Sequence, residues 1–595
     1  MKKIVKIATL ALMMPVMSAL VSCDDVFEPA IENHKNEQSI ADLPLWVNGL
    51  LSHAYISNPL DGWTFNDVAT DDAVSNQTGN SYLQMALGSW TANNNPTDQW
   101  RDLRGSIQFL NMVIEMAPGA PFSDIETTQA MFVERLQGEA YGLRALFMYH
   151  LLRHHAGWTT DGELLGVPIV LESETVNSNF NVPRNTFKEC YQQLMKDADM
   201  AISMLPNQFV NVDEVPAKYQ GKGINLGEYN RVWGIHMANR MNARVAKAVK
   251  AQAALLAASP AFSEGSGVTF AEAAELYADV LADLGANPIS QIDPTGHIWY
   301  ADNNVLAGIG AGANPLEIMW RGNKGENSDI ETSNYPPTLN GNGNINPSQN
   351  LVDAFPMVNG YPITDALSEY DPKNPYANRD PRLAKYIVFD GASVSVAGTV
   401  VETDVDDAGN ISGLNNWAAH STRTGYYMRK HLNEQVTIST TGSANSAFHY
   451  NAFIRYTEMF LSYAEAANEV WGPTGDGGNG YSAYDVIKAI RLRAGITGTN
   501  GVDGYLESVK NDKDKMRELI RNERRLELCF EGHRFWDLRR WKANLNETVK
   551  GVSISGNNYN YIDVEKREFK SHQYYGPIPY SEVVKYSNLQ QNEGW

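Results

Sequence analysis

Three glutamates near the end of the chain have the spacing of a potential acid–base centre. Glu523, Glu527 and Glu531 recur every four residues, which would place them on one face of a helix. The pair Asp71–Asp72 could likewise act on a glycosidic bond, with a stereochemical outcome set by the separation of the carboxylates. Like charges at four-residue spacing destabilise a helix unless cations neutralise them, and six arginines lie among residues 521–541. We therefore interpret this segment as a partly buried ion-pair network that fixes one packing arrangement.

Other patterns of catalysis or metal binding are weak or missing from the sequence. It contains no His-Glu-x-x-His motif, no Gly-x-Ser-x-Gly elbow and no complete phosphate-binding loop. The oxygen-rich cluster Asp302–Asn304 could attract calcium, although the loop lacks an EF-hand pattern. His154 and His155 are expected to end a helix, where cationic or polar side chains suit the dipole. We predict a protein that is not an enzyme and needs no cofactor, with calcium as the open alternative.

Helical periodicity is the commonest pattern in the chain and supplies the elements that must position these side chains. Leu143, Leu146 and Phe147, for example, recur at helical spacing, so their helix has one face to bury. The alanine-rich run 251–258 would let a neighbouring helix approach closely, as in helical stacks of the tetratricopeptide type. Helices are expected at residues 41–57, 99–116, 128–154, 186–205, 243–262, 271–284, 455–471, 483–493 and 505–540.

Long stretches rich in glycine, asparagine, proline and aromatic residues separate these helices, and such loops usually carry function. Alternating β-branched residues predict strands at 393–403 and 435–441, and the glycine-rich run 472–480 predicts a turn between two helices. The predicted fold class is mainly α, a tetratricopeptide-like helical scaffold with an irregular, loop-rich inserted lobe. One domain would span residues 38–595, with the scaffold at 38–284 and 451–541, the lobe at 285–450 and a C-terminal segment at 542–595.

The first residues have the pattern of a lipoprotein leader. A lysine-rich start precedes an apolar run, residues 7–20, that is too short to remain as a transmembrane helix. The sequence Leu20-Val21-Ser22-Cys23 resembles the lipobox of bacterial lipoproteins, in which cleavage leaves an acylated cysteine at the new N-terminus. We expect residues 1–22 to be a signal peptide, Cys23 to be lipidated and residues 23–37 to form a tether. Ordinary secretory cleavage without lipidation is the alternative.

The composition limits the possible partners. The 595 residues include 48 basic and 69 acidic side chains, for a formal net charge of −21. This excess of negative charge disfavours nucleic acid and other polyanions, so neutral ligands are the natural expectation. Cys190 and Cys529 fall within expected helices, where isolated cysteines usually behave as small buried apolar residues; a disulfide between them is the alternative.

Several motifs identify a family because they occur together and in one order. They resemble the segments of the SusD/RagB family, the starch-utilisation-system D-like outer-membrane lipoproteins, and the resemblance extends from Cys23 to Trp595. The segments are Glu139–Tyr149, Val182–Arg184, Ala257–Pro260, Asn346–Gln349, Leu351–Met357, Tyr370–Pro372, Asn374–Tyr376, Asn378–Arg382, Gly425–Lys430, Arg455–Glu458, Tyr463–Ala466, Arg521–Trp541, Pro577–Pro579 and Gln591–Trp595.

The resemblance implies a location, a partner and an activity. It implies a tetratricopeptide-like, SusD-like scaffold that a lipid anchors to the outer membrane, facing the cell exterior. Asp24 and Asp25 are similar to the acidic surface-export signal of such lipoproteins. It also implies a SusC-like TonB-dependent transporter as partner, and capture of an oligosaccharide or polysaccharide for delivery to that transporter without bond cleavage.

Ligand contacts in the resembled family tend to come from the loops after the first helix and from the inserted lobe. Sugar rings pack their C–H faces on aromatic side chains, while their hydroxyls need polar partners. We prefer Tyr82, Trp320 and Tyr335 as an aromatic platform that is exposed before ligand binds, and we expect Trp90 and Trp100 in the core. The candidate ligand-binding residues are Trp63, Asn80, Tyr82, Trp320, Arg321, Tyr335, Asn340 and Trp417, each of which could instead pack beneath a loop.

Two other functions remain open from the sequence. Peptide capture, which some RagB-like proteins perform, would use a large chamber and contacts to the peptide backbone. A helical-repeat scaffold would bind another protein and no soluble ligand. Neither the sugar, its linkage nor its length can be read from the sequence, because these depend on the relative positions of rings and polar groups in space.

Overall fold

The computed structural model describes residues 37–310, 313–498 and 501–595. The predicted signal peptide, the lipidation at Cys23 and residues 23–36 of the predicted tether lie outside this part of the chain. Within the described ranges, no helix combines the length and the apolar character that crossing a membrane requires.

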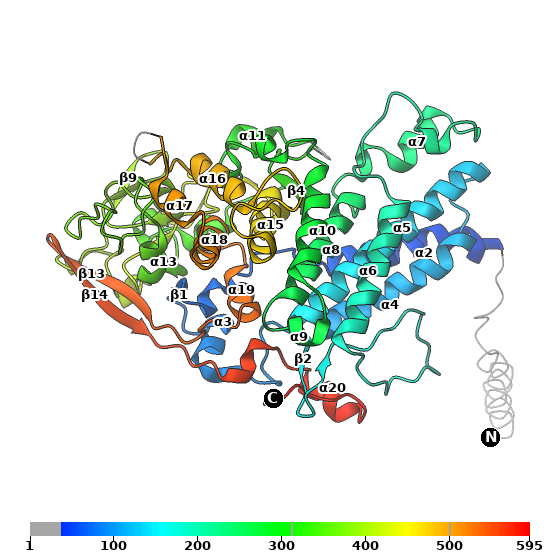
Figure 1. The fold of residues 1–595 in the computed structure, drawn as a ribbon, viewed down its shortest axis with the longest axis horizontal. Helices are drawn as coiled ribbons and strands as arrows, with labels where there is room; N and C mark the ends of the chain where they lie inside the picture. Colours follow the sequence, from blue (N-terminus) through cyan, green and yellow to red (C-terminus); the bar gives the residue numbers. More distant parts are fainter. Residues whose placement is uncertain (1–36, 311–312, 499–500) are drawn as a thin grey trace, which may run out of the picture.

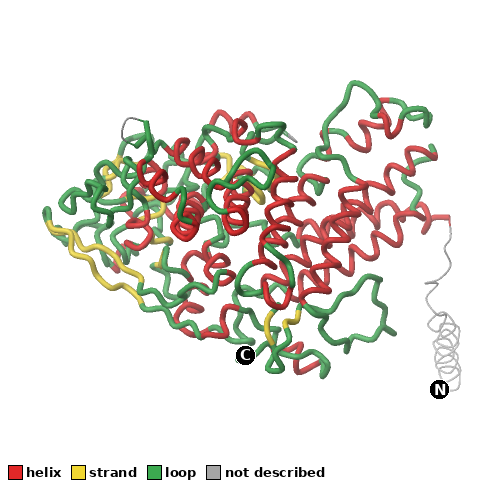
Figure 2. The backbone as a smooth tube through the Cα atoms, in the orientation of Figure 1, coloured by secondary structure: helices red, strands yellow, loops and turns green. Residues whose placement is uncertain are grey.

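A stack of helices forms one side of the molecule, and a loop-rich region forms the other (Figures 1 and 2). Each major helix of the stack packs against the one that follows it, from the first helix to α10, and α15 then packs against α10. The helices on the stack's side are α2 (Glu37–Ile56), α4 (Trp100–Met116), α5 (Glu126–His155), α6 (Phe187–Met204), α8 (Ala243–Ala258) and α10 (Phe270–Ala282). The stack continues into the loop-rich side through α15 (Tyr456–Trp471), α16 (Ala483–Ala494), α17 (Gly504–Val509) and α18 (Lys513–Glu527).

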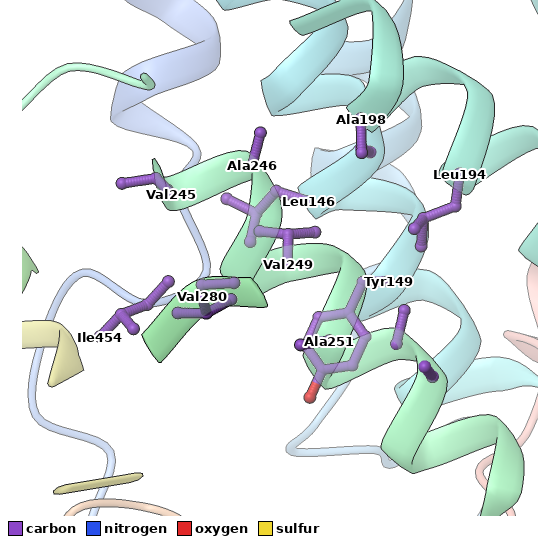
Figure 3. Close-up of a cluster of buried hydrophobic side chains, with 14 of the residues drawn as sticks. Leu146, Tyr149, Leu194, Ala198, Val245, Ala246, Val249, Ala251, Val280 and Ile454 are labelled. Carbon is purple, nitrogen blue, oxygen red and sulfur yellow. The ribbon is translucent and has the colours of Figure 1, made fainter. Parts of the chain in front are cut away.

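Small buried side chains allow these helices to approach one another. Ala246 and Ala251 of α8 are fully buried, and Leu146 of α5 and Val249 of α8 lie in the same cluster (Figure 3). The start of α6 is set by residues close together in the sequence. Thr186 Oγ1 accepts from the backbone N–H of Glu189 at 3.2 Å, and the Glu189 carboxylate accepts from the N–H of Thr186 at 2.9 Å. This capping box satisfies two backbone donors at the start of α6.

The remaining helices are short and lie mostly in the loop-rich region or at its border. They are α3 (Ser81–Gln84), α7 (Leu226–Trp233), α9 (Ser263–Ser266), α11 (Asn303–Gly308), α12 (Asp329–Asn334), α13 (Gln349–Ala354), α14 (Pro381–Tyr386), α19 (Arg534–Arg540) and α20 (Tyr580–Lys585).

All strands of the described residues pair two by two, in antiparallel fashion. The pairs are β1 (Ala73–Ser75) with β6 (Ile345–Pro347), β2 (Gly157–Trp158) with β3 (Leu164–Leu165), β4 (Ile318–Arg321) with β12 (Ala452–Arg455), β5 (Gly325–Asn327) with β11 (Ala447–His449), β7 (Ile387–Val388) with β10 (Tyr427–Met428), β8 (Ala392–Val394) with β9 (Thr399–Val401), and β13 (Val549–Ser555) with β14 (Asn558–Glu565).

Separate hydrophobic cores support the two sides. The helical stack shares one core, and the loop-rich region has a second core built from residues 299–450. Segments distant in sequence complete the second core: Val68–Leu83 from the region after α2, Leu526–Phe530 at the end of α18, and side chains of β13. A smaller cluster around Trp90, Phe535 and Trp536 lies where α19 meets the 66–89 segment. Trp90 and Trp100 are buried, as predicted.

The predicted helices up to residue 493 are confirmed with ends that differ by at most a few residues, but the predicted helix 505–540 is wrong. It is three helices, α17, α18 and α19. Asp512 caps α18 by accepting from the N–H of Asp514, and Phe530 and Gly532 adopt φ of 60° and 75° beyond its end. A left-handed residue cannot continue an α-helix.

The two strand predictions had different outcomes. Residues 393–403 form most of the β8–β9 hairpin, as expected. Residues 435–441 do not form a strand; only Ile438 makes an isolated bridge, to Ala444. The side chain of Asn445 accepts from the N–H of Thr437 instead, so a local side-chain contact replaces a strand ladder there. The run 472–480 joins α15 and α16 as a turn, as predicted.

The three glutamates belong to a network of ion pairs in which Glu523 and Glu527 are fully buried and the Glu531 side chain is 9% exposed. Glu523 accepts from Arg382 at 2.9 Å and from Arg491 at 2.6 Å, and Glu527 accepts from Arg493 at 2.6 Å. Burial alone would raise the pKa of Glu527, but Arg493 and the neighbouring cations lower it to about 2. Glu527 is therefore charged, and the ion pairs hold these carboxylates in place, as a structural network requires.

The arginines of residues 521–541 do not neutralise the three glutamates. Arg525 pairs with Asp71 at 2.9 Å and with Asp72 at 2.6 Å, and Arg534 pairs with Asp71 at 3.0 Å. The cations beside the three glutamates come from other segments of the fold: Arg382, Lys430, Arg455, Arg491 and Arg493. Both acidic groups considered for glycosidic chemistry are thus engaged in ion pairs that join distant segments.

Both cysteines within the described residues are free and buried, as predicted. Burial raises the pKa of the Cys190 thiol and that of the Cys529 thiol to about 12. The two thiols therefore stay neutral and act as small apolar side chains.

Candidate ligand-binding cleft

A cleft lies where the helical stack meets the loop-rich region. Its walls include the C-terminal part of α5, residues from α8, α10, α15, α18 and α19, the start of β12, and the segments 59–66 and 530–533. Such a junction between two packed units is a common place for a ligand site. The lining side chains include Leu60, Trp63, Thr64, Phe65, Asn66, Tyr82, Thr97, Gln99, Tyr149, Arg153, His154, Gln252, Tyr277, Trp299, His431, Asn451, Phe453, Glu458, Arg524, Glu531, His533, Trp536, Asp537 and Arg540.

Aromatic rings gather at the side of the cleft next to the second core. Trp63 stacks on Phe65 with ring centres 5.9 Å apart and meets the His431 ring at 4.6 Å. His431 in turn lies 5.7 Å from Trp299, and Phe453 lines the same cleft. Trp63 and Phe453 are only partly buried, so their rings retain surface for a ligand.

A hydrogen bond joins the segment that follows Trp63 to Phe530, which is distant in the sequence. Phe65 has a left-handed backbone, with φ of 42°, and precedes a short 3-10 turn at Asn66–Ala69. In that turn, Asp67 Oδ1 accepts from the N–H of Phe530 at 3.0 Å. Burial, followed by the charge of Asp72, raises the pKa of Asp67 to about 7. The position of the aromatic wall therefore depends on contacts between residues more than 450 positions apart.

The part of the lining that comes from α5 and α19 carries polar side chains, and we call it the polar wall. The Arg153 guanidinium lies 4.5 Å from the centre of the Trp536 ring, and its Nη2 donates to Nδ1 of His150 at 3.1 Å. The His154 ring also packs on Trp536, at 4.3 Å. Burial and the charge of Arg153 lower the pKa of both histidines well below the ordinary value, so both rings are neutral.

The structure brings Trp63 and Tyr82 together in the cleft, as two of the predicted ligand-binding residues. Tyr82 is partly buried, and burial raises its pKa. The prediction that these two rings contact a ligand is untested by their placement and stays a prediction.

The expectation that Trp320 and Tyr335 form an exposed platform is wrong. Each is only 1% exposed. The indole of Trp320 donates to the carbonyl of Asn239 at 2.8 Å and belongs to the first core, while the hydroxyl of Tyr335 donates to the carbonyl of Asn433 at 3.0 Å within the second. Both rings fasten segments together, because a large side chain with one polar atom can be buried when that atom finds a partner.

Three of the predicted polar residues have structural partners. Arg321 is 4% exposed and donates to Asn314 at 2.8 Å. Asn340 adopts φ of 61°, and its side chain donates to the carbonyl of Ile438 at 2.7 Å. Asn80 caps α3 by accepting from the N–H of Leu83 at 3.1 Å. None of the three lines the cleft.

Trp417 lies outside the cleft on an open surface, and its side chain is 64% exposed. It begins a 3-10 turn that leads to His420, whose carbonyl accepts from the Asn76 side chain at 2.5 Å. Gln77 donates to the Asn344 side chain at 2.8 Å beside this contact. An exposed indole therefore lies near amide groups from the loop after α2.

The cleft residues that were missed include Arg153, Trp299, His431, Phe453 and Trp536. Trp299 and Phe453 lie in the loop-rich region, so a search of its aromatic residues could have found them. Arg153 and Trp536 lie within helices, and nothing in their spacing distinguishes them from scaffold residues. Only the packing of α5 against α19 reveals that they face a cleft.

No metal site accompanies the cleft. Within the residues that the structure describes, no group of three or more His, Cys, Asp or Glu side chains has an arrangement suited to a metal ion. Asp302, considered for calcium, instead caps α11 by accepting from the N–H groups of Asn304 and Val305 at 3.0 and 3.1 Å.

Comparison with protein families gives two matches. Residues 298–595 match the model of the SusD family, and residues 32–219 match the model described as starch-binding and associating with the outer membrane. Among individual proteins, SusD-like protein P38 of Formosa agariphila is 36% identical over 104 residues, which cover 17% of this chain and 18% of that protein. The aligned stretch thus spans less than a fifth of the length of this relative.

Solved structures share the fold over nearly the whole chain. A SusD-like carbohydrate binding protein from Bacteroides fragilis is 23% identical, with a TM-score of 0.66 and coverage of 92% of this chain and 98% of the other. A laminarin binding SusD-like protein is 18% identical, with a TM-score of 0.55 and coverage of 92% and 99%. At these identities, the likeness establishes the mainly α, tetratricopeptide-like architecture.

Proposed function

The chain belongs to the SusD family, and from this premise we propose that it captures oligosaccharides at the cell surface in the cleft between its two cores. The observation that carries the proposal is the composition of the cleft: partly buried aromatic rings and hydrogen-bonding side chains line the same cavity. A pyranose needs both, because its C–H face packs on a ring while its hydroxyls require donors and acceptors.

The names of two relatives of the same fold support a carbohydrate ligand, since one is called a carbohydrate binding protein and the other laminarin binding. The cleft of this chain fits that chemistry through Trp63 and Phe453, whose rings keep exposed surface. Polar groups of Thr64, Gln99 and Asn451 lie in the same lining. Capture without bond cleavage is our proposal, because the acidic pairs considered for hydrolysis hold the fold together.

We propose further that the protein is lipidated at Cys23, faces outward from the outer membrane and passes its ligand to a SusC-like TonB-dependent transporter. The lipobox-like Leu20-Val21-Ser22-Cys23 supports the anchor. The family model for residues 32–219 supports the membrane association through its description. Replacing Cys23 by alanine should release the protein from the membrane fraction, and continued membrane association would contradict lipid anchoring at this residue.

The experiment that tests the ligand class is isothermal titration of the purified protein with plant, fungal, bacterial and host oligosaccharides, and with a peptide digest. Saturable heat with at least one glycan is the expected result. Heat with the digest alone would contradict glycan capture and support a peptide ligand. Silence across the whole panel would contradict a soluble ligand and favour a scaffold role.

A further inference from the structure

Arg153 differs from the other arginines that line the cleft. Arg524 donates to Asp537 at 2.6 Å, and Arg540 donates to Glu465 at 2.5 Å and to Asp537 at 2.9 Å. No ion pair joins Arg153 to a carboxylate within the described ranges of the chain. Its partners within these ranges are neutral: His150 through a hydrogen bond, and the rings of Tyr149 and Trp536.

Among the described residues, the side chains that contact Arg153 carry no negative charge. Its neighbours His150 and His154 are neutral, and burial followed by the charge of Arg524 lowers the pKa of His533 to about 3. Arg539 adds a second guanidinium, which lies 5.1 Å from the centre of the Trp536 ring. The Nε of Arg539 donates to the backbone carbonyls of Gln573 and Tyr574.

The carboxylates of Glu531 and Glu458, which line the cleft, interact with side chains other than Arg153. Glu531 pairs with Lys430 at 2.6 Å and with Arg455 at 2.7 Å. Glu458 accepts from Gln252 at 2.8 Å, and burial raises its pKa, which favours the neutral acid. Of the three guanidinium groups that line the cleft, Arg153 is therefore the one without a carboxylate partner among the described residues, since Arg524 and Arg540 are paired; the net charge of the whole chain is −21.

The guanidinium of Arg153 is held ready for a planar anion. Stacking on Trp536 and the bond from Nη2 to His150 fix its plane. Its Nε is buried without a hydrogen-bond partner, while Nη1 makes no hydrogen bond in the described part of the protein. A guanidinium presents donors in a fork that matches two oxygens of a carboxylate or of a sulfate group. An anionic ligand group beside Nη1 and Nη2 would supply the negative charge that no paired carboxylate supplies here.

We propose that the captured glycan is acidic, and that Arg153 binds its anionic group, which is either the carboxylate of a uronic acid or a sulfate ester. The proposal rests on the proposed function, because it names the chemical class of the oligosaccharide that the cleft takes. It replaces the expectation of a neutral ligand, which came from the net charge of the whole chain, because a ligand responds to the charge that it meets within a few ångströms.

The test compares ligands that differ only in charge. Oligogalacturonate and the oligogalactoside obtained by reducing its carboxyl groups form one pair; a sulfated galactan oligosaccharide and its desulfated form make the other. Titration calorimetry should show that the charged member of one pair binds about tenfold more tightly or better, and that added salt weakens it. The pair that shows the difference identifies carboxylate or sulfate as the bound group.

A protein variant tests the assigned residue. Arg153→Gln should reduce affinity for the charged member about tenfold or more and leave any affinity for its neutral partner nearly unchanged; Arg153→Lys should retain part of the preference. Arg104→Gln is the matched control, because Arg104 also stacks on a tryptophan, Trp100 at 5.4 Å, but lies outside the cleft. If Arg153→Gln fails to fold, the ligand pairs still decide whether the captured glycan is acidic.

The outcomes separate this proposal from the function on which it rests. Equal or tighter binding of the neutral members overturns the acidic ligand while glycan capture stands. A charge preference that survives Arg153→Gln in a folded variant overturns the role of Arg153. Failure to bind any glycan of either charge contradicts glycan capture, and the acidic class with it.

Discussion

The buried network around Glu527 and the polar wall of the cleft use the same kinds of side chain for different ends. In the network, each guanidinium meets carboxylates from distant segments, such as Arg382 with Asp380 at 2.7 Å and with Glu527 at 3.1 Å. At the cleft wall, Arg153 meets only neutral rings. A satisfied buried charge stabilises one packing arrangement, whereas an unsatisfied one at a cleft is available to a ligand.

Breaking the network should have the largest effect. Glu527→Gln removes one of the negative charges that neutralise Arg382, Arg455 and Arg493, so we expect the free energy of unfolding to fall by about 3–5 kcal/mol, measured by denaturant titration. Arg101→Gln is the control, because its pair with Asp102 is exposed, and it should leave the unfolding midpoint unchanged. Equal midpoints for the two variants would contradict a structural role for the network.

Two tryptophans sharpen the contrast between core and open surface. Trp320→Ala should lower the free energy of unfolding by about 3–5 kcal/mol, because the ring is buried and bonded to Asn239, whereas Trp417→Ala should change it by less than about 0.5 kcal/mol. Thermal unfolding of both variants checks this expectation. A stable Trp320→Ala variant would mean that the ring contributes little to the core.

The ionisation of Asp67, which contacts Phe530 beside the cleft, should make the stability of the protein depend on pH. Its carboxyl ionises near the ordinary value of 3.8 in the unfolded chain but near 7 in the folded protein, where burial and the charge of Asp72 disfavour ionisation. The folded state therefore holds more protons between these values, and the contribution of Asp67 to stability falls as pH rises from about 4 to about 7.

Asp67→Asn removes this titration while its side-chain oxygen can still accept from the N–H of Phe530. The variant should gain stability relative to the unmodified protein as pH rises, by roughly 4 kcal/mol at most above pH 7. Denaturant midpoints of both proteins between pH 4 and 8 measure the difference. A gap that does not change with pH would show that Asp67 does not titrate in this window.

A change in the aromatic wall of the cleft should have the smallest effect of these variants, and it should act on ligand binding. Trp63→Ala should weaken binding of the captured glycan by about 1–2 kcal/mol, because a partly exposed ring loses one packing surface for a sugar. Titration calorimetry measures this loss, and Trp417→Ala serves as the matched tryptophan outside the cleft. An equal loss in both variants would place ligand contacts on the open surface as well, and a loss in Trp417→Ala alone would move the site there.

Much of the scaffold was predictable because it depends on local patterns. The helix α5 follows from apolar residues at helical spacing, and α6 begins where Thr186 and Glu189 form a capping box. The break after α18 was missed because the left-handed backbone at Phe530 is stabilised by Asp67, a residue more than 450 positions away. The strand predicted at 435–441 does not form, because a local side chain, that of Asn445, satisfies the backbone there.

The sequence by itself determined the helical stack, the buried cysteines and the membership of a family, since each depends on residue types at short or ordered spacings. Only the tertiary structure decided which aromatic residues are open to a ligand. Trp320 and Trp417 both lie in loop-rich segments, yet one is 1% and the other 64% exposed. It also decided that Arg153 pairs with no carboxylate among the described residues, because the charge that a side chain meets depends on segments that only folding brings together.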